Sequence, residues 1–402
     1  MELKKYKLAD IAKIEISGVD KKTIEGETPV RLCNFVDVYY NWAVTKEKAK
    51  AFMTASAKQT EIDKCSIGKG MVAITKDSET RDDIGIATYI ADDFEDVLLG
   101  YHCALITPNP AIVDGKYLNA FMHTRYIQKY FENNASGSGQ RYTLSNDTIS
   151  NIPVLLPSIE EQHTIGKLLA DSDRKIELNK QINDNLEAMA KQLYDYWFVQ
   201  FDFPNEEGKP YKSSGGAMVW NEKLKREIPQ GWDFCFLENL LTIKNGRDHK
   251  HLADGIYPVY GSGGEMRKAS EYLYDGESVL MPRKGSLNNI MYVNEAFWTV
   301  DTMFYSEMKQ SNCAKYIYYT IKDIDFTRWD SGTGVPSMTS STLYSIKLVK
   351  PQSEILKKFD EVISPLFEHM KQISEQDSVL TKQRDELIPL LMNGQASINY
   401  HL

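Results

Sequence analysis

Two stretches of the chain place apolar residues at a regular spacing of seven, a pattern typical of helices that pair in a coiled coil. In the first stretch, one row begins at Ile165 and a second at Leu169, and no proline or glycine interrupts residues 167–203. Both rows recur 194 residues later, from Phe359 and Ile363. We therefore predict two long helices. The residues expected to line their seam are Ile165, Leu169, Ile176, Leu186, Leu193, Phe359, Ile363, Leu366, Met370, Ile373, Leu380 and Leu387.

Polar residues interrupt this seam, and they bear on its register because buried polar groups penalise shifted pairings. They are Asn179 and Asn183 in the first stretch and Asp377 and Arg384 in the second. Asn183 facing either Ile373 or Asp377 is compatible with the pattern, so the sequence leaves the pairing open. Pro365 removes a helix hydrogen bond, and the regular coil is therefore expected to start only near Leu366.

The offset of 194 extends beyond the helices and indicates an internal duplication. It carries Pro157 onto Pro351, and Ser-Gly runs at 136–139 and 331–334 precede the two helices at similar distances. The starts of the two globular segments also correspond, at an offset of 229, where Leu8, Ile11 and Ile14 match Leu237, Leu240 and Ile243. The ends of the two halves therefore repeat, and their middles differ.

Short apolar runs separated by turns are typical of strands. Examples are residues 84–90, 279–281 and 290–293, and a helix is expected over 116–131. The predicted fold class is α/β (α+β), with two mixed α/β domains separated by the long helices and related by a pseudo-twofold repeat. The predicted boundaries are 1–156 and 220–350 for the domains, 157–203 and 351–394 for the helices, 204–219 for a connector rich in Pro, Gly and Ser, and 395–402 for a tail.

The charge distribution argues against a protein that holds nucleic acid by bulk positive charge. The net charge is −9, and most of it lies on the helices, where residues 157–203 carry −4 and residues 351–402 carry −3. The five cysteines form no C-x-x-C pair, which excludes a zinc ribbon. No apolar run approaches the roughly 18 residues of a membrane span, and the polar N-terminus is unlike a signal peptide. A cytoplasmic protein is therefore expected.

Motifs that carry catalytic chemistry are missing from the sequence. There is no P-loop and no Asn/Asp-Pro-Pro-aromatic run of an adenine methyltransferase. The glycine-rich run at 261–264 does not match a dinucleotide fingerprint, and a plain turn is the simpler interpretation. His249 and His251 lie on opposite faces of any strand and lack a third metal ligand. We therefore predict no catalytic residues and no metal site, and the pattern favours a binding protein.

Four segments resemble the specificity subunit of type I restriction–modification systems. Residues 176–190 (IELNKQINDNLEAMA) and 193–204 (LYDYWFVQFDFP) resemble the central conserved region of that family. Residues 384–394 (RDELIPLLMNG) are similar to its distal conserved region, and residues 229–232 (PQGW) are similar to the entry of its second recognition domain. The resemblance covers nearly the whole chain.

The resemblance implies a non-catalytic subunit that recognises double-stranded DNA. Each of two target-recognition domains would contact one half of a split, asymmetric sequence, and the long helices would pair antiparallel and hold the domains apart. Two methyltransferase subunits would dock on the helices, and motor-nuclease subunits would join them. No cofactor is expected in this chain, because S-adenosylmethionine would bind the methyltransferase. The chain alone is expected to bind DNA weakly.

Candidate DNA-binding residues lie in polar turns, because base edges are contacted by side chains that reach into a groove. In the second domain, one turn runs from Lys244 to Lys250 and another covers 283–288, and an ordinary solvated hairpin is the alternative for each. Arginine suits guanine and asparagine suits adenine, whereas lysine and serine suit phosphates. The candidates there are Arg247, Lys250, Tyr260, Ser262, Arg283, Lys284, Ser286, Asn288 and Thr302.

In the first domain, polar residues flank a strand-like run, and an ordinary charged surface is the alternative explanation. These candidates are Lys69, Lys76, Asp77, Ser78 and Arg81. The two Ser-Gly loops occupy equivalent places, and their small residues would let backbone amides approach a phosphate closely; a simple hinge explains them equally well. The candidates in and after these loops are Ser136, Ser138, Gln140, Arg141, Thr143, Ser331 and Thr333.

Two other functions fit parts of the pattern. A coiled-coil scaffold whose globular domains bind proteins would explain the heptads, but not the matched loops and basic turns. An enzyme acting on DNA would need motifs that the sequence lacks. Sequence preference in DNA binding would distinguish a DNA-recognition protein from a scaffold, because a scaffold would show none. Methyl transfer by the chain alone would support an enzyme.

Overall fold

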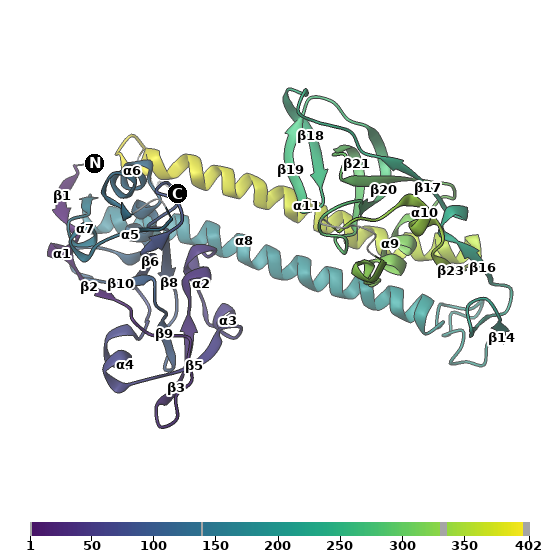
Figure 1. The fold of residues 1–402 in the computed structure, drawn as a ribbon, viewed down its shortest axis with the longest axis horizontal. Coiled ribbons are helices and arrows are strands. Elements are labelled where there is room, and N and C mark those ends of the chain that lie inside the picture. Colours follow the sequence, from purple (N-terminus) through teal and green to yellow (C-terminus); the bar gives the residue numbers. More distant parts are fainter. Residues whose placement is uncertain (1, 138–139, 330–335, 397–402) are drawn as a thin grey trace. The chain divides into compact units, whose positions relative to one another are not determined.

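The computed structural model describes residues 2–137, 140–329 and 336–396. Its contacts divide the chain into two compact units. The first unit combines residues 1–181 with 373–402, and the second consists of residues 182–372. Each contains one globular domain and a part of each long helix (Figure 1). Residues 373–396 therefore complete the unit to which the first domain belongs.

The first unit is organised around a five-stranded sheet in the order β2-β10-β6-β8-β4. β4 pairs parallel to β8, and the other neighbours are antiparallel. A second sheet, β5-β3-β9, and two small ones, β1-β13 and β11-β12-β7, complete the domain. The strands are β1 (Lys4–Lys7), β2 (Ala12–Ile16), β3 (Thr28–Cys33), β4 (Ala43–Val44), β5 (Met53–Ala57), β6 (Val72–Thr75), β7 (Asp77–Ser78), β8 (Ala87–Ile90), β9 (Val97–Leu99), β10 (Cys103–Pro108), β11 (Ser136–Gly137), β12 (Tyr142–Thr143) and β13 (Pro153–Leu156).

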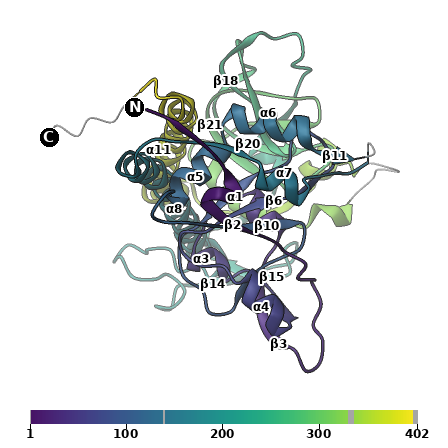
Figure 2. The same ribbon diagram turned by 90° about the vertical axis from the view of Figure 1, so that its left-hand side faces the viewer.

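Short helices surround these strands, and Figure 2 shows α5 beside β6, and α1 and α7 beside β2. The helices are α1 (Leu8–Ile11), α2 (Phe35–Tyr39), α3 (Lys46–Ala49), α4 (Gln59–Cys65), α5 (Gly115–Met122), α6 (Arg125–Asn134) and α7 (Asn146–Ser150). The single helix expected over 116–131 is wrong, because Thr124 separates α5 from α6. Its hydroxyl accepts a hydrogen bond from the Ile127 amide and so caps the start of α6.

The second unit contains a six-stranded sheet in the order β17-β22-β20-β21-β18-β19. Its strands are β14 (Met218–Asn221), β15 (Arg226–Pro229), β16 (Asp233–Phe236), β17 (Leu241–Asn245), β18 (Asp254–Gly261), β19 (Gly264–Ala269), β20 (Tyr274–Pro282), β21 (Met291–Thr299), β22 (Met303–Met308) and β23 (Lys347–Lys350). Its short helices are the π-helix η1 (Asp195–Val199), the 3₁₀ helices η2 (Leu237–Asn239) and η3 (Phe326–Trp329), and the α-helices α9 (Ala314–Lys322) and α10 (Ser340–Tyr344). The connector 204–219 is fixed to this unit, because Asp202 accepts hydrogen bonds from the amide and hydroxyl of Ser213.

The internal duplication is confirmed by matching hydrogen bonds within the two units. β1 pairs with β13 as β16 pairs with β23, at the predicted offsets of 229 and 194. The Leu8 amide donates to the Ile152 carbonyl at 3.0 Å, and the Leu237 amide donates to the Ile346 carbonyl at 2.9 Å. β10 pairs with β2 as β22 pairs with β17, with Ile14 and Ile243 at matching positions. The two domains therefore share one framework at their ends.

The two long helices are α8 (Ile159–Tyr194) and α11 (Ser353–Met392). A capping box starts α8, since the Ser158 hydroxyl accepts from the Glu161 amide and the Glu161 carboxylate accepts from the Ser158 amide. The second helix was expected over 351–394, with a regular coil only from near Leu366. α11 begins at Ser353 and runs through Pro365, so the expected interruption at the proline is wrong. A proline inside a helix removes one backbone hydrogen bond and crowds the preceding turn, but Phe359 and Ile363 before it are buried.

Contacts inside each unit show the two helices antiparallel. In the first unit, Ile165 and Leu169 share a buried core with Ile388 and Leu391. In the second, the rings of Trp197 and Phe359 lie 5.5 Å apart between centroids. Among the predicted seam residues, Ile165, Leu169, Phe359, Ile363 and Ile373 are buried and the other seven are half-buried.

The polar seam residues of the first unit are paired. Asn179 Nδ2 donates to Asp377 Oδ1 at 2.6 Å and to Gln376 Oε1 at 3.0 Å. Arg384 lies 3.9 Å from Asp173, with both side chains mostly buried. Asn179 is thus a partner of Asp377, and this pairing fixes the local register.

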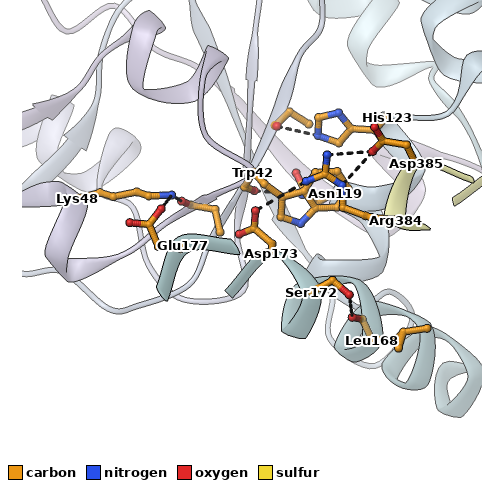
Figure 3. Close-up of polar contacts among 12 residues, drawn as sticks. Trp42, Lys48, Asn119, His123, Leu168, Ser172, Asp173, Glu177, Arg384 and Asp385 are labelled. Carbon is orange, nitrogen blue, oxygen red and sulfur yellow. Dashed lines mark hydrogen bonds and ion pairs between the residues drawn. The ribbon is translucent and has the colours of Figure 1, made fainter. Parts of the chain in front are cut away.

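The first domain meets α11 through an aromatic cluster (Figure 3). The Arg384 guanidinium lies 4.8 Å from the centre of the Trp42 ring, which stacks on His123 at 4.4 Å. His123 Nε2 bonds the Ala87 carbonyl at 3.0 Å. Burial lowers the pKa of His123 to about 4, and the charge of Arg384 acts in the same direction. His123 is therefore neutral at pH 7 and packs as an uncharged ring.

Candidate nucleic-acid interface

The small sheet β11-β12-β7 brings together most of the residues predicted for the first domain. Asp77 pairs with Thr143 across β7 and β12, and Ser136 pairs with Thr143 across β11 and β12. The two groups of candidates, one before residue 82 and one after residue 135, thus form a single surface. It carries Lys76, Asp77, Ser78, Arg81, Ser136, Gln140, Arg141 and Thr143.

A surface hollow of about 650 Å³ opens beside this sheet. Its lining includes Ser17, Lys76, Asp77, His102, Arg141 and Thr143. His102 was missed by the sequence analysis. It lies in the turn before β10, and its φ of 68° is in the left-handed region that non-glycine residues rarely adopt. A single histidine in a turn has no sequence signature that would have identified it.

Asp77 is the acidic centre of the hollow, with a side chain only 12% exposed. Its Oδ2 lies 2.5 Å from His102 Nδ1 and 3.8 Å from Arg141 Nη2. Burial raises the pKa of Asp77, but hydrogen bonds from Thr143 and His102 and the charge of Lys76 outweigh burial and lower it. The carboxylate is therefore ionised, and cationic and hydrogen-bonding neighbours compensate its charge.

Two basic candidates of the first domain have different surroundings. The Arg81 guanidinium lies 5.0 Å from the centre of the Tyr142 ring, on the same small sheet. Lys69 lies elsewhere, at a cavity of about 610 Å³ that Trp42 and Lys116 also line. The structure therefore separates Lys69 from the other candidates of this domain.

In the second domain, the turn after β20 is held by backbone hydrogen bonds. The amides of Arg283 and Lys284 donate to the Thr302 carbonyl at 2.8 and 3.2 Å. The Gly285 amide donates to the Pro336 carbonyl, and Lys284 forms a β-bridge with Ser337. The side chains of Arg283, Lys284 and Ser286 are exposed. A fixed backbone thus presents exposed basic side chains to solvent.

Neighbouring turns are tied to the same region. The Asn289 side chain donates to the Ser262 carbonyl at 2.8 Å. The Arg247 amide donates to the Thr299 carbonyl at 2.9 Å, in the turn that leads to Thr302. Arg247 and Lys250 are exposed. Hydrogen bonds therefore connect the segments that carry Ser262 and Arg247 to neighbouring parts of the same domain.

Two candidates use their polar atoms inside the domain. Asn288 donates to Asp325 at 3.2 Å and accepts from the Phe326 amide at 2.8 Å. The Tyr260 hydroxyl donates to Glu295 at 3.1 Å. Burial and the Glu295 carboxylate raise the pKa of Tyr260. These geometries favour positioning roles for both residues. Ser138, Ser331 and Thr333 lie outside the described residues.

The two surfaces share one pattern of backbone hydrogen bonds, the backbone frame. The Lys76 amide donates to the His102 carbonyl at 2.7 Å, as the Arg283 amide donates to the Thr302 carbonyl. The Leu144 amide donates to the Lys76 carbonyl at 2.8 Å, and the Met338 amide donates to the Arg283 carbonyl at 2.9 Å. The frame positions are therefore equivalent, but their side chains differ.

The described part of the chain gives no sign of a metal centre or a membrane span. Over residues 2–137, 140–329 and 336–396, no cluster of His, Cys, Asp and Glu could hold a metal ion. Over the same ranges, no helix is long and apolar enough to cross a membrane.

Comparison with known proteins relates almost the whole chain to one family. Residues 1–188 and 229–376 match the family described as type I restriction modification DNA specificity domain. The MjaIX specificity subunit of a type I restriction enzyme from Methanocaldococcus jannaschii is 27% identical over 322 residues, covering 73% of this chain and 71% of that protein. The HindI specificity subunit from Haemophilus influenzae is 22% identical over 392 residues, covering 79% and 85%.

A solved structure shares the fold. The type I restriction–modification S subunit from M. genitalium aligns with a TM-score of 0.60 and 17% identity, covering 97% of this chain and 96% of that one. At this identity the likeness extends to the fold alone.

Proposed function

Because this chain belongs to the type I restriction–modification DNA specificity family, we propose that it recognises a bipartite, asymmetric DNA target, with one half-site for each domain. The observation that carries the proposal is the shared backbone frame. Its equivalent positions hold Lys76 and His102 in one domain and Arg283 and Thr302 in the other. The same frame with different side chains suits two different half-sites, since base edges are distinguished by donors and acceptors.

The proposed roles follow the exposure and chemistry of the side chains. Arg141, Arg247 and Arg283 would contact base edges, and lysines and hydroxyl groups would contact phosphates. The residues assigned to DNA contact or to positioning it remain Lys69, Lys76, Asp77, Ser78, Arg81, Ser136, Ser138, Gln140, Arg141, Thr143, Arg247, Lys250, Tyr260, Ser262, Arg283, Lys284, Ser286, Asn288, Thr302, Ser331 and Thr333.

The chain itself would be non-catalytic and would act in a complex. Two methyltransferase subunits would dock on α8 and α11, whose segments carry net charges of −4 and −3 and would suit a basic partner surface. Motor-nuclease subunits would join this assembly, and S-adenosylmethionine would bind the methyltransferase. In this arrangement the predicted domains 1–156 and 220–350 are the target-recognition domains.

Mapping modified adenines in the host genome tests the proposal. We expect a split, asymmetric motif whose methylation requires both this chain and its methyltransferase subunit. Gel-shift measurements on the purified complex should show the same sequence preference. A coiled-coil scaffold would show no preference, and that result would refute the proposal.

Substitutions in the turn after β20 are expected to separate base contacts from phosphate contacts. Arg283→Ala should weaken binding by about 1–3 kcal/mol and relax one position of the motif. Lys284→Ala should weaken binding to all sequences alike and reduce the salt slope by about one. Anisotropy titrations of the assembled complex at several salt concentrations measure both effects. If neither substitution changed binding, this turn would lie outside the groove.

A further inference from the structure

The hollow in the first domain holds an arginine whose guanidinium is anchored on one side. Arg141 Nη2 lies 2.8 Å from His102 Nδ1 and 3.0 Å from His102 Nε2. His102 Nδ1 is also 2.5 Å from Asp77 Oδ2. The arrangement runs from a mostly buried carboxylate, through an imidazole, to a side chain that is 59% exposed.

The carboxylate determines which nitrogen of the imidazole is the acceptor. Ionised Asp77 only accepts, so His102 Nδ1 carries the hydrogen and donates to it. Nδ1 then cannot also accept, so the hydrogen bond from Arg141 Nη2 goes to Nε2 at 3.0 Å, although Nη2 lies slightly nearer Nδ1. Asp77 thereby orients His102, and His102 orients Arg141.

Most of the guanidinium remains available to a ligand. Arginine has five N–H donors in a fixed planar fork. Within the described residues, the hydrogen bonds of the guanidinium involve Nη2 alone. Nη2 carries two hydrogens, one parallel to the Nε–H and the other parallel to an N–H of Nη1. A hydrogen bond to His102 uses one of them and fixes the direction of the fork, so one edge, made by the second Nη2 hydrogen and its parallel neighbour, stays available for bidentate contact with a planar acceptor pair.

The neighbouring carboxylate favours a base edge over a phosphate. Asp77 Oδ2 lies 3.8 Å from Arg141 Nη2 and reduces the local positive potential that would attract a phosphate. The negative charge of Asp77 weakens the attraction of a neutral base acceptor less than that of a phosphate. The fixed geometry of the donors also favours hydrogen bonds to a base edge. Arg81, which lies against Tyr142 on the same sheet, provides an exposed arginine without this arrangement.

We infer that Arg141 recognises a guanine in the first half-site, with Asp77 and His102 as positioning residues. Guanine presents O6 and N7 as adjacent acceptors in the major groove, which match two donors of an arginine fork. The inference rests on the proposed function, because it requires that this hollow faces DNA. It deepens that function by naming a base and the residue that recognises it.

The test uses the full chain assembled with its methyltransferase and a DNA library randomised at the first half-site. Arg141→Ala should abolish the preference for guanine at one position and lower affinity for the best site about 5- to 150-fold. The salt slope should stay unchanged, because no phosphate contact is lost. Arg141→Lys keeps the charge but loses the fork, so it should lose the same preference. His102→Ala should weaken that preference and no other.

Arg81→Ala is the matched control. It should weaken binding to all sequences alike and reduce the salt slope by about one. The same pattern for Arg141→Ala would overturn the inference, because Arg141 would then contact a phosphate.

The second half-site reports whether each variant is folded and assembled. If the second half-site is recognised normally and Arg141→Ala leaves the base preference at the first half-site unchanged, the inference alone is wrong. If the unmodified complex shows no sequence preference at either half-site, the proposed function fails, and the inference fails with it.

Discussion

Exchanging residues 220–350 for the second domain of another family member is expected to change one half of the methylated motif and leave the other half unchanged. The reason is that the frame of the first domain uses only residues of its own unit, such as Lys76, His102 and Leu144. The second domain packs on α8 through Tyr319 and Lys322, which contact Glu187. A donor domain that retains these contacts should assemble normally. Sequencing of modified bases in cells that carry the chimaera measures the outcome.

The reciprocal exchange, of residues 1–156, provides the control. It should change the opposite half of the motif and preserve the half that the first chimaera altered. If either chimaera changed both halves, the domains would not recognise their half-sites independently. The proposal of one half-site for each domain would then be wrong.

Lengthening both long helices by one heptad is expected to lengthen the spacer between the half-sites by about one to three base pairs. Seven residues add about 10 Å of helix at 1.5 Å per residue, and DNA rises about 3.4 Å per base pair. The Asn179–Asp377 and Trp197–Phe359 pairs place matched insertion points after Gln181 and after Ser374. An insertion there keeps both seams in phase. Methylation mapping gives the new spacer directly.

A five-residue insertion at the same two points is the matched control. It adds about 7.5 Å but turns the flanking seam segments about 140° apart, at roughly 100° per residue. We expect this variant to lose assembly and methylation. An active heptad variant that kept its original spacer would show that the helices do not set the distance.

The regular parts of the fold were predictable because they repeat. The heptad rows identified both long helices, and the offsets of 194 and 229 matched β1 to β16 and β13 to β23. Local exceptions were not predictable from periodicity. Thr124 divides an expected helix because its hydroxyl caps a new one. Pro365 lies inside α11 although it removes a helix hydrogen bond, because the stability of a helix in a protein comes mostly from the packing of its apolar face, here Phe359 and Ile363.

The candidate surfaces were predictable in part. Polar turns and Ser-Gly loops indicated the right kind of segment, but a sequence does not tell which turns meet in space. Asp77 and Arg141 are 64 positions apart and come together only because β7 pairs with β12. Tyr260 shows the opposite effect, since it lies at the end of strand β18 and its hydroxyl donates to Glu295 within the domain. His102 was missed because its role depends on both of these neighbours.

The discontinuous first unit also has a consequence for how the protein is made. Residues 1–181 emerge from the ribosome first, but residues 373–402 of the same unit follow only after the whole second unit. At about 5–20 residues per second, synthesis of the intervening segment takes about 10–40 s. During that interval Ile165 and Leu169 lack the apolar partners that Ile388 and Leu391 later supply. The nascent chain thus exposes an apolar face of α8, a surface that chaperones bind and that promotes aggregation. This face is covered only when the last turns of α11 have been translated.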